Sequence, residues 1–183
     1  MASSLFVLGG ARSGKSRFAV SCQPSHALVT FLATAQPGDG DMAARIARHR
    51  TERPGHWTTI EEPFELVERL STITGDAVVV DCLTVWVANR MLRGDPGEEI
   101  LVEADALARL VRRPPCALTI VSNEVGAGIH PETVDGLRFR DLLGIVNQRI
   151  AAAAQRVVLM VAGIPLAVKN PSDESPIPAL QTG

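Results

Sequence analysis

The chain has 183 residues, of which 46% are hydrophobic and 21% charged, and its formal net charge is −2. This length and composition are typical of one soluble globular domain with a sizeable core, and the near-neutral charge gives no reason to expect nucleic acid as a partner. The three cysteines are odd in number, lie far apart and form no C-x-x-C pair, so neither a disulfide framework nor a zinc site is indicated, which favours a reducing, cytoplasmic location. The most apolar stretch, 150–168, is interrupted by Arg156 and Pro165, so we expect no membrane span.

Short apolar runs rich in β-branched residues alternate along the chain with longer segments of helical spacing. We expect strands at 5–8, 28–33, 77–81, 117–122, 157–161 and 166–169, and helices at 15–21, 41–52, 63–70, 98–111 and 136–154. Most strand runs are apolar on successive residues, as in strands that are covered on both faces. The alternation predicts an α/β fold of three layers, with a mostly parallel sheet between helices. We expect a single domain over 1–169 and a loose, proline-rich tail over 170–183.

The segment GGARSGKS at 9–16 matches the phosphate-binding pattern G-x-x-x-x-G-K-[ST]. Its residues are Gly9, Gly10, Ala11, Arg12, Ser13, Gly14, Lys15 and Ser16. Glycines let backbone N–H groups turn toward phosphate oxygens, while the lysine reaches the β and γ phosphates and the serine hydroxyl binds Mg²⁺. The match follows a predicted strand and opens a predicted helix, which is the context that the motif requires. It predicts a P-loop NTPase fold of the RecA-like kind.

Asp81 ends the apolar run AVVVD, and an acidic residue at such a position holds Mg²⁺ through water in P-loop enzymes. Aspartate at a strand end also serves as a helix N-cap, and the pattern alone allows both roles. Glu124 follows another predicted strand. It could orient an accepting hydroxyl, contact the metal, or only shape its loop.

The segment 41–57 carries four arginines, and a helix capped by Asp41 would place Arg45 and His49 on one face. Neighbouring guanidinium groups favour the neutral imidazole, which is a nucleophile. On these residues alone, a histidine in a basic amphipathic helix is more often a solvated or phosphate-contacting residue than a nucleophile, and both roles stay open for His49. His56 and Trp57, just beyond, either lie beside the nucleotide or begin a strand, with Trp57 better suited to the core.

Four motifs occur together and in order: GGARSGKS, then MAARIARHR followed by RPGHW, then NEVG at 123–126, and VNQRIAAAA at 146–154. From about residue 5 to 169 the chain therefore resembles the bifunctional adenosylcobinamide kinase and adenosylcobinamide-phosphate guanylyltransferase family of cobalamin biosynthesis. The resemblance implies phosphorylation of adenosylcobinamide by ATP or GTP. It also implies guanylylation of His49 by GTP, transfer of GMP to adenosylcobinamide phosphate, and a homotrimer.

The resemblance also implies which residues contact the nucleotide. Besides 9–16 they are Thr34, Ala35, Gln36, Arg50, Thr51, Glu52, Arg53, Glu61 and Asp81, with Ser16 and Asp81 on the Mg²⁺ side. Asp81 stands where some members have glutamate, and Arg50 where lysine also occurs. Two other functions keep the same phosphate loop. One is a single-function P-loop kinase for a small molecule, with His49 only electrostatic, and the other is a RecA-like motor or regulatory module.

Overall fold

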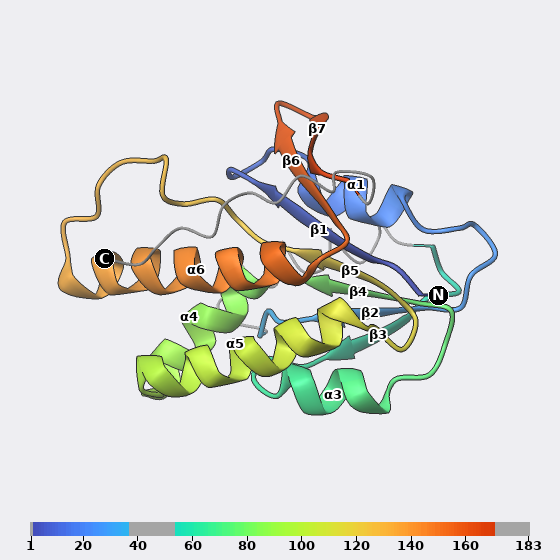
Figure 1. Cartoon of the computed structure of the whole chain (residues 1–183), viewed down its shortest axis with the longest axis horizontal. Helices are drawn as coiled ribbons and strands as arrows, with labels where there is room; N and C mark the ends of the chain where they lie inside the picture. The colour runs from blue at the N-terminus through green and yellow to red at the C-terminus, as the bar shows by residue number, and fades with distance from the viewer. Residues whose placement is uncertain (1, 37–53, 171–183) are drawn as a thin grey trace.

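The computed structural model describes residues 2–36 and 54–170, and Figure 1 shows the order of its elements. They are β1 (Ser4–Gly9), α1 (Lys15–Ser21), β2 (Val29–Ala33), β3 (Thr58–Glu61), α3 (Leu66–Thr72), β4 (Ala77–Asp81), α4 (Leu83–Arg93), α5 (Gly97–Arg112), β5 (Ala117–Val121), α6 (Val134–Ala153), β6 (Arg156–Val161) and β7 (Ile164–Lys169). The predicted helix at 41–52 and all but the first residue of the predicted tail lie outside the described residues.

The strands form one seven-stranded sheet in the order β3-β2-β4-β5-β1-β6-β7. Every neighbouring pair is parallel except β6 and β7, which form an antiparallel hairpin at the edge. Helix α1 covers one face of the sheet, and α3, α4, α5 and α6 cover the other (Figure 1). The predicted three-layer α/β fold with a mostly parallel sheet is thus confirmed.

The central strands are buried on both faces, which explains their continuous apolar runs. In β1, Phe6 belongs to the large core cluster beneath α3–α6, whereas Val7 belongs to the smaller cluster beneath α1. In β4, Val78 and Val79 divide in the same way. Successive strand residues point to opposite faces, so a strand covered by helices on both sides needs an apolar residue at every position.

Two elements differ from the sequence prediction because tertiary contacts decide them. Strand β3 is a short edge strand of sequence TTIE that pairs only with β2 among the described strands, and it has no apolar run to reveal it. Helix α4 directly follows β4, and its sequence begins LTVWV, which resembles a continued strand. Gly94 ends α4 in a left-handed conformation with φ of 95°.

Helix α3 also begins three residues later than its prediction at 63–70. The Glu62 carboxylate accepts hydrogen bonds from the backbone N–H groups of Phe64 and Glu65, at 3.2 and 2.9 Å. These bonds form a turn that delays the first helical residue to Leu66.

Just after the C-terminal end of α4, one aspartate is bound by two arginines of that helix, and this ion pair leads to a stability prediction. Asp95 accepts hydrogen bonds from Arg93, at 2.7 and 2.8 Å, and from Arg90, which is only 5% exposed and lies over the Trp86 ring. The hydrogen bonds from Arg93 lower the pKa of Asp95 to about 2 from its ordinary 3.8. A carboxylate whose folded pKa is depressed stabilises the fold above its unfolded pKa and loses that contribution as the pH falls.

We expect Asp95→Asn to lower the free energy of unfolding by about 1–2 kcal/mol at pH 7, because the amide keeps an acceptor but not the charge. The difference from wild type should shrink as the pH falls from about 4 toward 2. Urea unfolding at pH 7 and pH 3 measures it, with Asp141→Asn as the control because that paired carboxylate is 64% exposed. A difference that stays the same at both pH values would contradict the prediction.

Candidate active site

The phosphate loop leaves the sheet at the carboxyl end of β1, which ends at Gly9, and α1 begins at Lys15. A Cβ at Gly9 would lie 2.6 Å from Ser13 Oγ and 2.7 Å from the carbonyl oxygen of Met160 in β6, so only glycine fits there. The turn between β6 and β7 braces the loop from outside, since the N–H of Gly163 donates to the carbonyl of Ser13 at 3.0 Å. The conformation of the loop is therefore fixed by contacts with β6 and with the turn between β6 and β7.

Lys15 points into this loop. Its side chain is buried, with 8% of the residue exposed, and Nζ donates to the carbonyl of Gly10 at 2.7 Å. Burial lowers the pKa of Lys15, and the nearby Asp81 carboxylate opposes that shift. Burial raises the pKa of the Cys82 thiol to about 11, so this thiol is neutral at pH 7 and adds no charge to the site. A phosphate oxygen would stabilise the desolvated ammonium better than the single carbonyl does.

Ser13 gives a second sign that the loop is built for an anion. Its Oγ is buried and has no hydrogen-bond partner among the described residues. Buried hydroxyl groups in folded proteins are nearly always paired, and leaving one unpaired costs about 1–3 kcal/mol. The unpaired hydroxyl and the inward-pointing lysine both fit a bound phosphate group.

The ends of β2 and β4 are joined beside the loop. The buried Thr34 hydroxyl donates to the Cys82 carbonyl at 2.8 Å and accepts from the Cys82 N–H at 2.9 Å. The N–H of Thr34 donates to the carbonyl of Asp81 at 3.1 Å. Thr34, expected as a nucleotide contact, thus also fixes where Asp81 leaves the sheet.

The other predicted residues fall into two groups. Ala35 and Gln36 follow Thr34, and Glu61 ends β3 opposite Ala33, so these residues share the carboxyl edge of the sheet with the phosphate loop and Asp81. Ser16 is half-buried in the first turn of α1. The predicted residues outside the described part of the chain are His49, Arg50, Thr51, Glu52 and Arg53.

Two polar side chains that the sequence did not single out support this edge from α4. The Asn89 amide donates to the carbonyls of Thr34, at 2.8 Å, and Pro63, at 3.3 Å. The Thr84 hydroxyl accepts from the N–H of Asn123 at 2.7 Å. A polar residue within an apolar helical segment is the signal that could have found both, but α4 itself was not expected.

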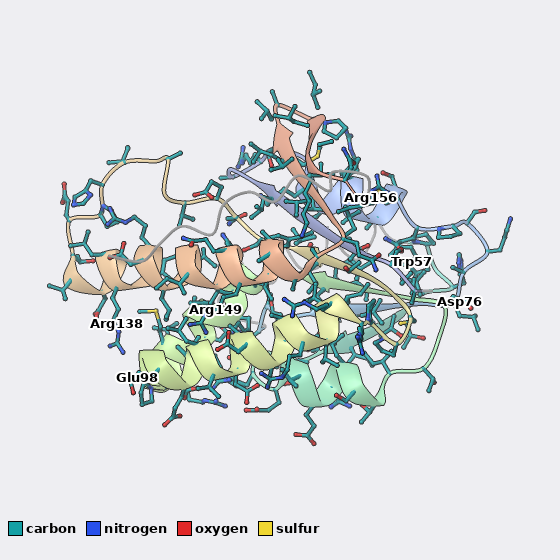
Figure 2. All side chains as sticks on the ribbon, viewed as in Figure 1. Trp57, Asp76, Glu98, Arg138, Arg149 and Arg156 are labelled. Atoms are coloured by element: carbon teal, nitrogen blue, oxygen red, sulfur yellow. The ribbon has the colours of Figure 1, made fainter. Side chains whose placement is uncertain are left out.

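Trp57 lies at the opposite edge. It immediately precedes β3, as Asp76 precedes β4, and Figure 2 labels both at the amino ends of these strands. The half-buried Trp57 ring packs against the core cluster beneath α1. Of the two roles left open by the sequence, the structure supports the one in which Trp57 begins a strand and packs in the core.

A nucleotide-binding enzyme of the P-loop class is defined by this arrangement, in which a strand leads into a glycine-rich loop with a buried lysine and an aspartate ends a strand two positions away in the sheet. Solved structures agree on the fold. A type III secretion ATPase superposes with a TM-score of 0.54 at 10% identity, over 90% of this chain and 56% of that one. The protein PH0250 from Pyrococcus horikoshii superposes with the same score and identity, over 94% and 88%.

Residues 5–168 match the family model described as cobinamide kinase / cobinamide phosphate guanyltransferase, and the chain belongs to that family. It is 43% identical over 167 residues to the bifunctional adenosylcobalamin biosynthesis protein CobP of Pseudomonas aeruginosa, covering 90% of this chain and 96% of the relative. It is 39% identical over 179 residues to CobU of Escherichia coli, covering 90% and 99%. The protein is thus a nucleotide-using kinase and guanylyltransferase of adenosylcobalamin biosynthesis, which argues against the single-function kinase and the motor.

Two further observations concern the described residues alone. No helix among them is long and apolar enough to cross a membrane. They also contain no group of three or more histidine, cysteine or acidic side chains that could hold a metal ion by themselves. Mg²⁺ needs few protein ligands when phosphate oxygens and water complete its shell, so the pair of Ser16 and Asp81 fits its chemistry.

Proposed function

We propose that the loop 9–16 binds the triphosphate of ATP or GTP for transfer of the γ-phosphoryl group to the terminal hydroxyl of the aminopropanol arm of adenosylcobinamide. Lys15 neutralises the β and γ oxygens, and Ser16 and Asp81 are the residues that would hold Mg²⁺, which would supply further positive charge. Ala35, Gln36 and Glu61 face the nucleotide from the same edge. The observation that carries this proposal is the buried Lys15 ammonium, held 2.7 Å from a loop carbonyl that a phosphate oxygen would replace.

We propose for the second reaction that His49 attacks the α-phosphorus of GTP and expels pyrophosphate, leaving GMP bound to the imidazole. The phosphate of adenosylcobinamide phosphate then takes up the GMP and frees the histidine, giving adenosyl-GDP-cobinamide. Support comes from the family, whose description includes a guanyltransferase, and from the two arginines that closely follow His49 in the sequence, Arg50 and Arg53. Thr51 and Glu52 complete the proposed nucleotide contacts of this segment.

Incubation of the protein with GTP labelled at the α-phosphate tests the covalent step. We expect a protein-bound label that is stable in alkali and labile in acid, and that His49→Ala abolishes. His26→Ala and His130→Ala are matched controls that should keep the label, because both histidines are exposed and far in sequence from 49. Equal labelling of wild type and His49→Ala would refute the role of His49.

We further propose a homotrimer, one catalytic domain over 1–169 and a cytoplasmic location. The β6–β7 hairpin supports an assembly, since Ile164, Leu166 and Val168 are large apolar residues exposed on one edge strand. Pro165 interrupts the row of N–H donors along this strand, which favours side-chain packing over strand pairing with another copy. Light scattering measures the oligomeric state directly.

A further inference from the structure

Two sequence motifs that have no role in the proposals above meet in the structure. Asn147, in the motif VNQRIAAAA, donates from Nδ2 to the carbonyl of Asn123, in the motif NEVG, at 3.0 Å. Asn147 is only 6% exposed and lies on the buried face of α6 with Val146 and Ile150. Burying an amide among apolar side chains is unfavourable unless its hydrogen bonds are needed. Its Oδ1 atom has no partner among the described residues, so the bond to Asn123 is the contact that Asn147 provides.

Helix α6 is itself held firmly in place. Figure 2 shows Arg149 projecting from α6 toward α5. There the Arg149 guanidinium donates to the carbonyl of Leu101 at 2.6 Å and pairs with Asp105 at 2.8 Å. Asn147 lies two residues away on the same helix, so the position of its side-chain amide is fixed by the packing of α6 against α5.

Asn123 and its neighbour are fixed from two further sides. The N–H of Asn123 donates to the hydroxyl of Thr84 on α4 at 2.7 Å, and this hydroxyl also contacts Ser122 Oγ at 3.4 Å. The N–H of Glu124 donates to the carbonyl of Gly9 at 3.1 Å. Hydrogen bonds to α4, α6 and Gly9 thus hold the two peptide groups on either side of Asn123 in place.

These contacts place Glu124 beside the phosphate loop. Its side chain is exposed, and Oε1 accepts from the N–H of Gly126 at 2.7 Å, which limits the directions that the carboxylate can take. Glu61 lies four strands away from β1, on β3, and Asp81 is assigned to the Mg²⁺ side. Phosphoryl transfer also needs a group that orients the attacking hydroxyl and takes its proton.

We propose that Glu124 is the catalytic residue on the acceptor side of the kinase reaction and that Asn147 is a positioning residue that acts through Asn123. The substrate hydroxyl oxygen forms a bond to the γ-phosphorus, and its proton passes to the Glu124 carboxylate. The bond from the γ-phosphorus to the bridging oxygen breaks, and the nucleoside diphosphate leaves with that electron pair. This assignment rests on the proposed role of the loop 9–16.

A double-mutant cycle on the full chain tests both residues. We expect Glu124→Gln to lower kcat for adenosylcobinamide phosphorylation by about a hundredfold or more, with KM for the nucleotide changed less than about threefold. Asn147→Ala should lower kcat by about tenfold. In the Glu124→Gln background, Asn147→Ala should lower it no further, since the residue it positions is already lost. Thr84→Val, of nearly the same shape, should show the same non-additivity if Asn147→Ala folds poorly.

Gln148→Ala is the matched control, because Gln148 is the exposed neighbour of Asn147 in the same motif and should leave kcat unchanged. Full kcat in Glu124→Gln would overturn the catalytic role. A further tenfold loss in the double variant would overturn the positioning role. Labelling of the protein by GTP uses no acceptor hydroxyl, so it should survive in the variants at Glu124, Asn147, Thr84 and Gln148. Its loss in Glu124→Gln would assign that residue to nucleotide binding instead, whereas loss of label in His49→Ala alone concerns the second reaction.

Discussion

Lys15→Ala is expected to lower kcat of the kinase reaction by about a thousandfold or more, a loss of about 4 kcal/mol in transition-state stabilisation. Negative charge on the transferring phosphoryl group and the leaving diphosphate is stabilised by groups already held in position. Lys15 is such a group, because its ammonium is buried within the loop before any ligand arrives. Steady-state kinetics with saturating nucleotide measures the effect.

The same variant should not unfold more easily. Burial lowers the pKa of Lys15, which means that the fold disfavours its charged form, so its removal relieves desolvation. We therefore expect the urea midpoint of Lys15→Ala to equal or exceed that of the wild type. Retention of more than a tenth of wild-type kcat would contradict the assigned role.

The only other lysine of the chain offers a matched control. Lys169 donates from Nζ to the carbonyls of Ala151, at 3.2 Å, and Ala152, at 3.0 Å, at the end of α6. Lys169→Ala should cost some stability through this lost cap and leave kcat unchanged. Opposite effects of the two lysine variants would separate catalysis from folding.

The features that could be predicted from the sequence are those whose signal is local. Strand β4 has the bounds predicted for it at 77–81, because a run of apolar residues ending in aspartate is visible within five residues. Helix α1 has the predicted bounds at 15–21, since the phosphate-loop motif fixes where its helix begins. Strands β6 and β7 run antiparallel because a turn of two residues, Ala162 and Gly163, joins them, and both residues have a positive φ.

Helix α4 could not be predicted because its first turns carry the composition of a strand. Packing makes this segment a helix. Trp86 is fully buried in the larger core cluster, and its indole N–H donates to the carbonyl of Phe64 at 2.7 Å. Strand β3 likewise exists because β2 offers it a partner. Propensity is a weak guide where tertiary contacts of this kind outweigh it.

The residues of the candidate site also divide into those with a local sequence signal and those that only tertiary contacts reveal. The phosphate-loop motif identifies Lys15, and the apolar run 77–81 identifies Asp81, but neither pattern identifies the groups that hold these residues in place. Thr34 and Cys82 are 48 residues apart, and Asn123 and Asn147 are 24 apart, and each pair meets only through the sheet order and helix packing. Supporting contacts between distant residues have no local pattern, so only the folded chain reveals them.

Gly9→Ala tests how strictly the loop depends on such contacts. The new Cβ would meet Ser13 Oγ at 2.6 Å and the Met160 carbonyl at 2.7 Å. Ser13 could rotate away, but the Met160 carbonyl belongs to β6, which is paired with β1 at this residue. Since two paired strands cannot separate at little cost, we expect a loss of about 2–4 kcal/mol in the free energy of unfolding.

Gly10→Ala is the matched control, because nothing lies within 4 Å of a Cβ at Gly10 and its stability should change by less than about 0.5 kcal/mol. Gly9→Ala should also weaken nucleotide binding by about a hundredfold, as measured by calorimetry at a temperature where the variant is folded. Gly9 is where β1 enters the loop and where the N–H of Glu124 is held, so one methyl group should disturb both the phosphate cradle and the acceptor side. Equal stability of the two alanine variants would show instead that the loop can yield at Met160.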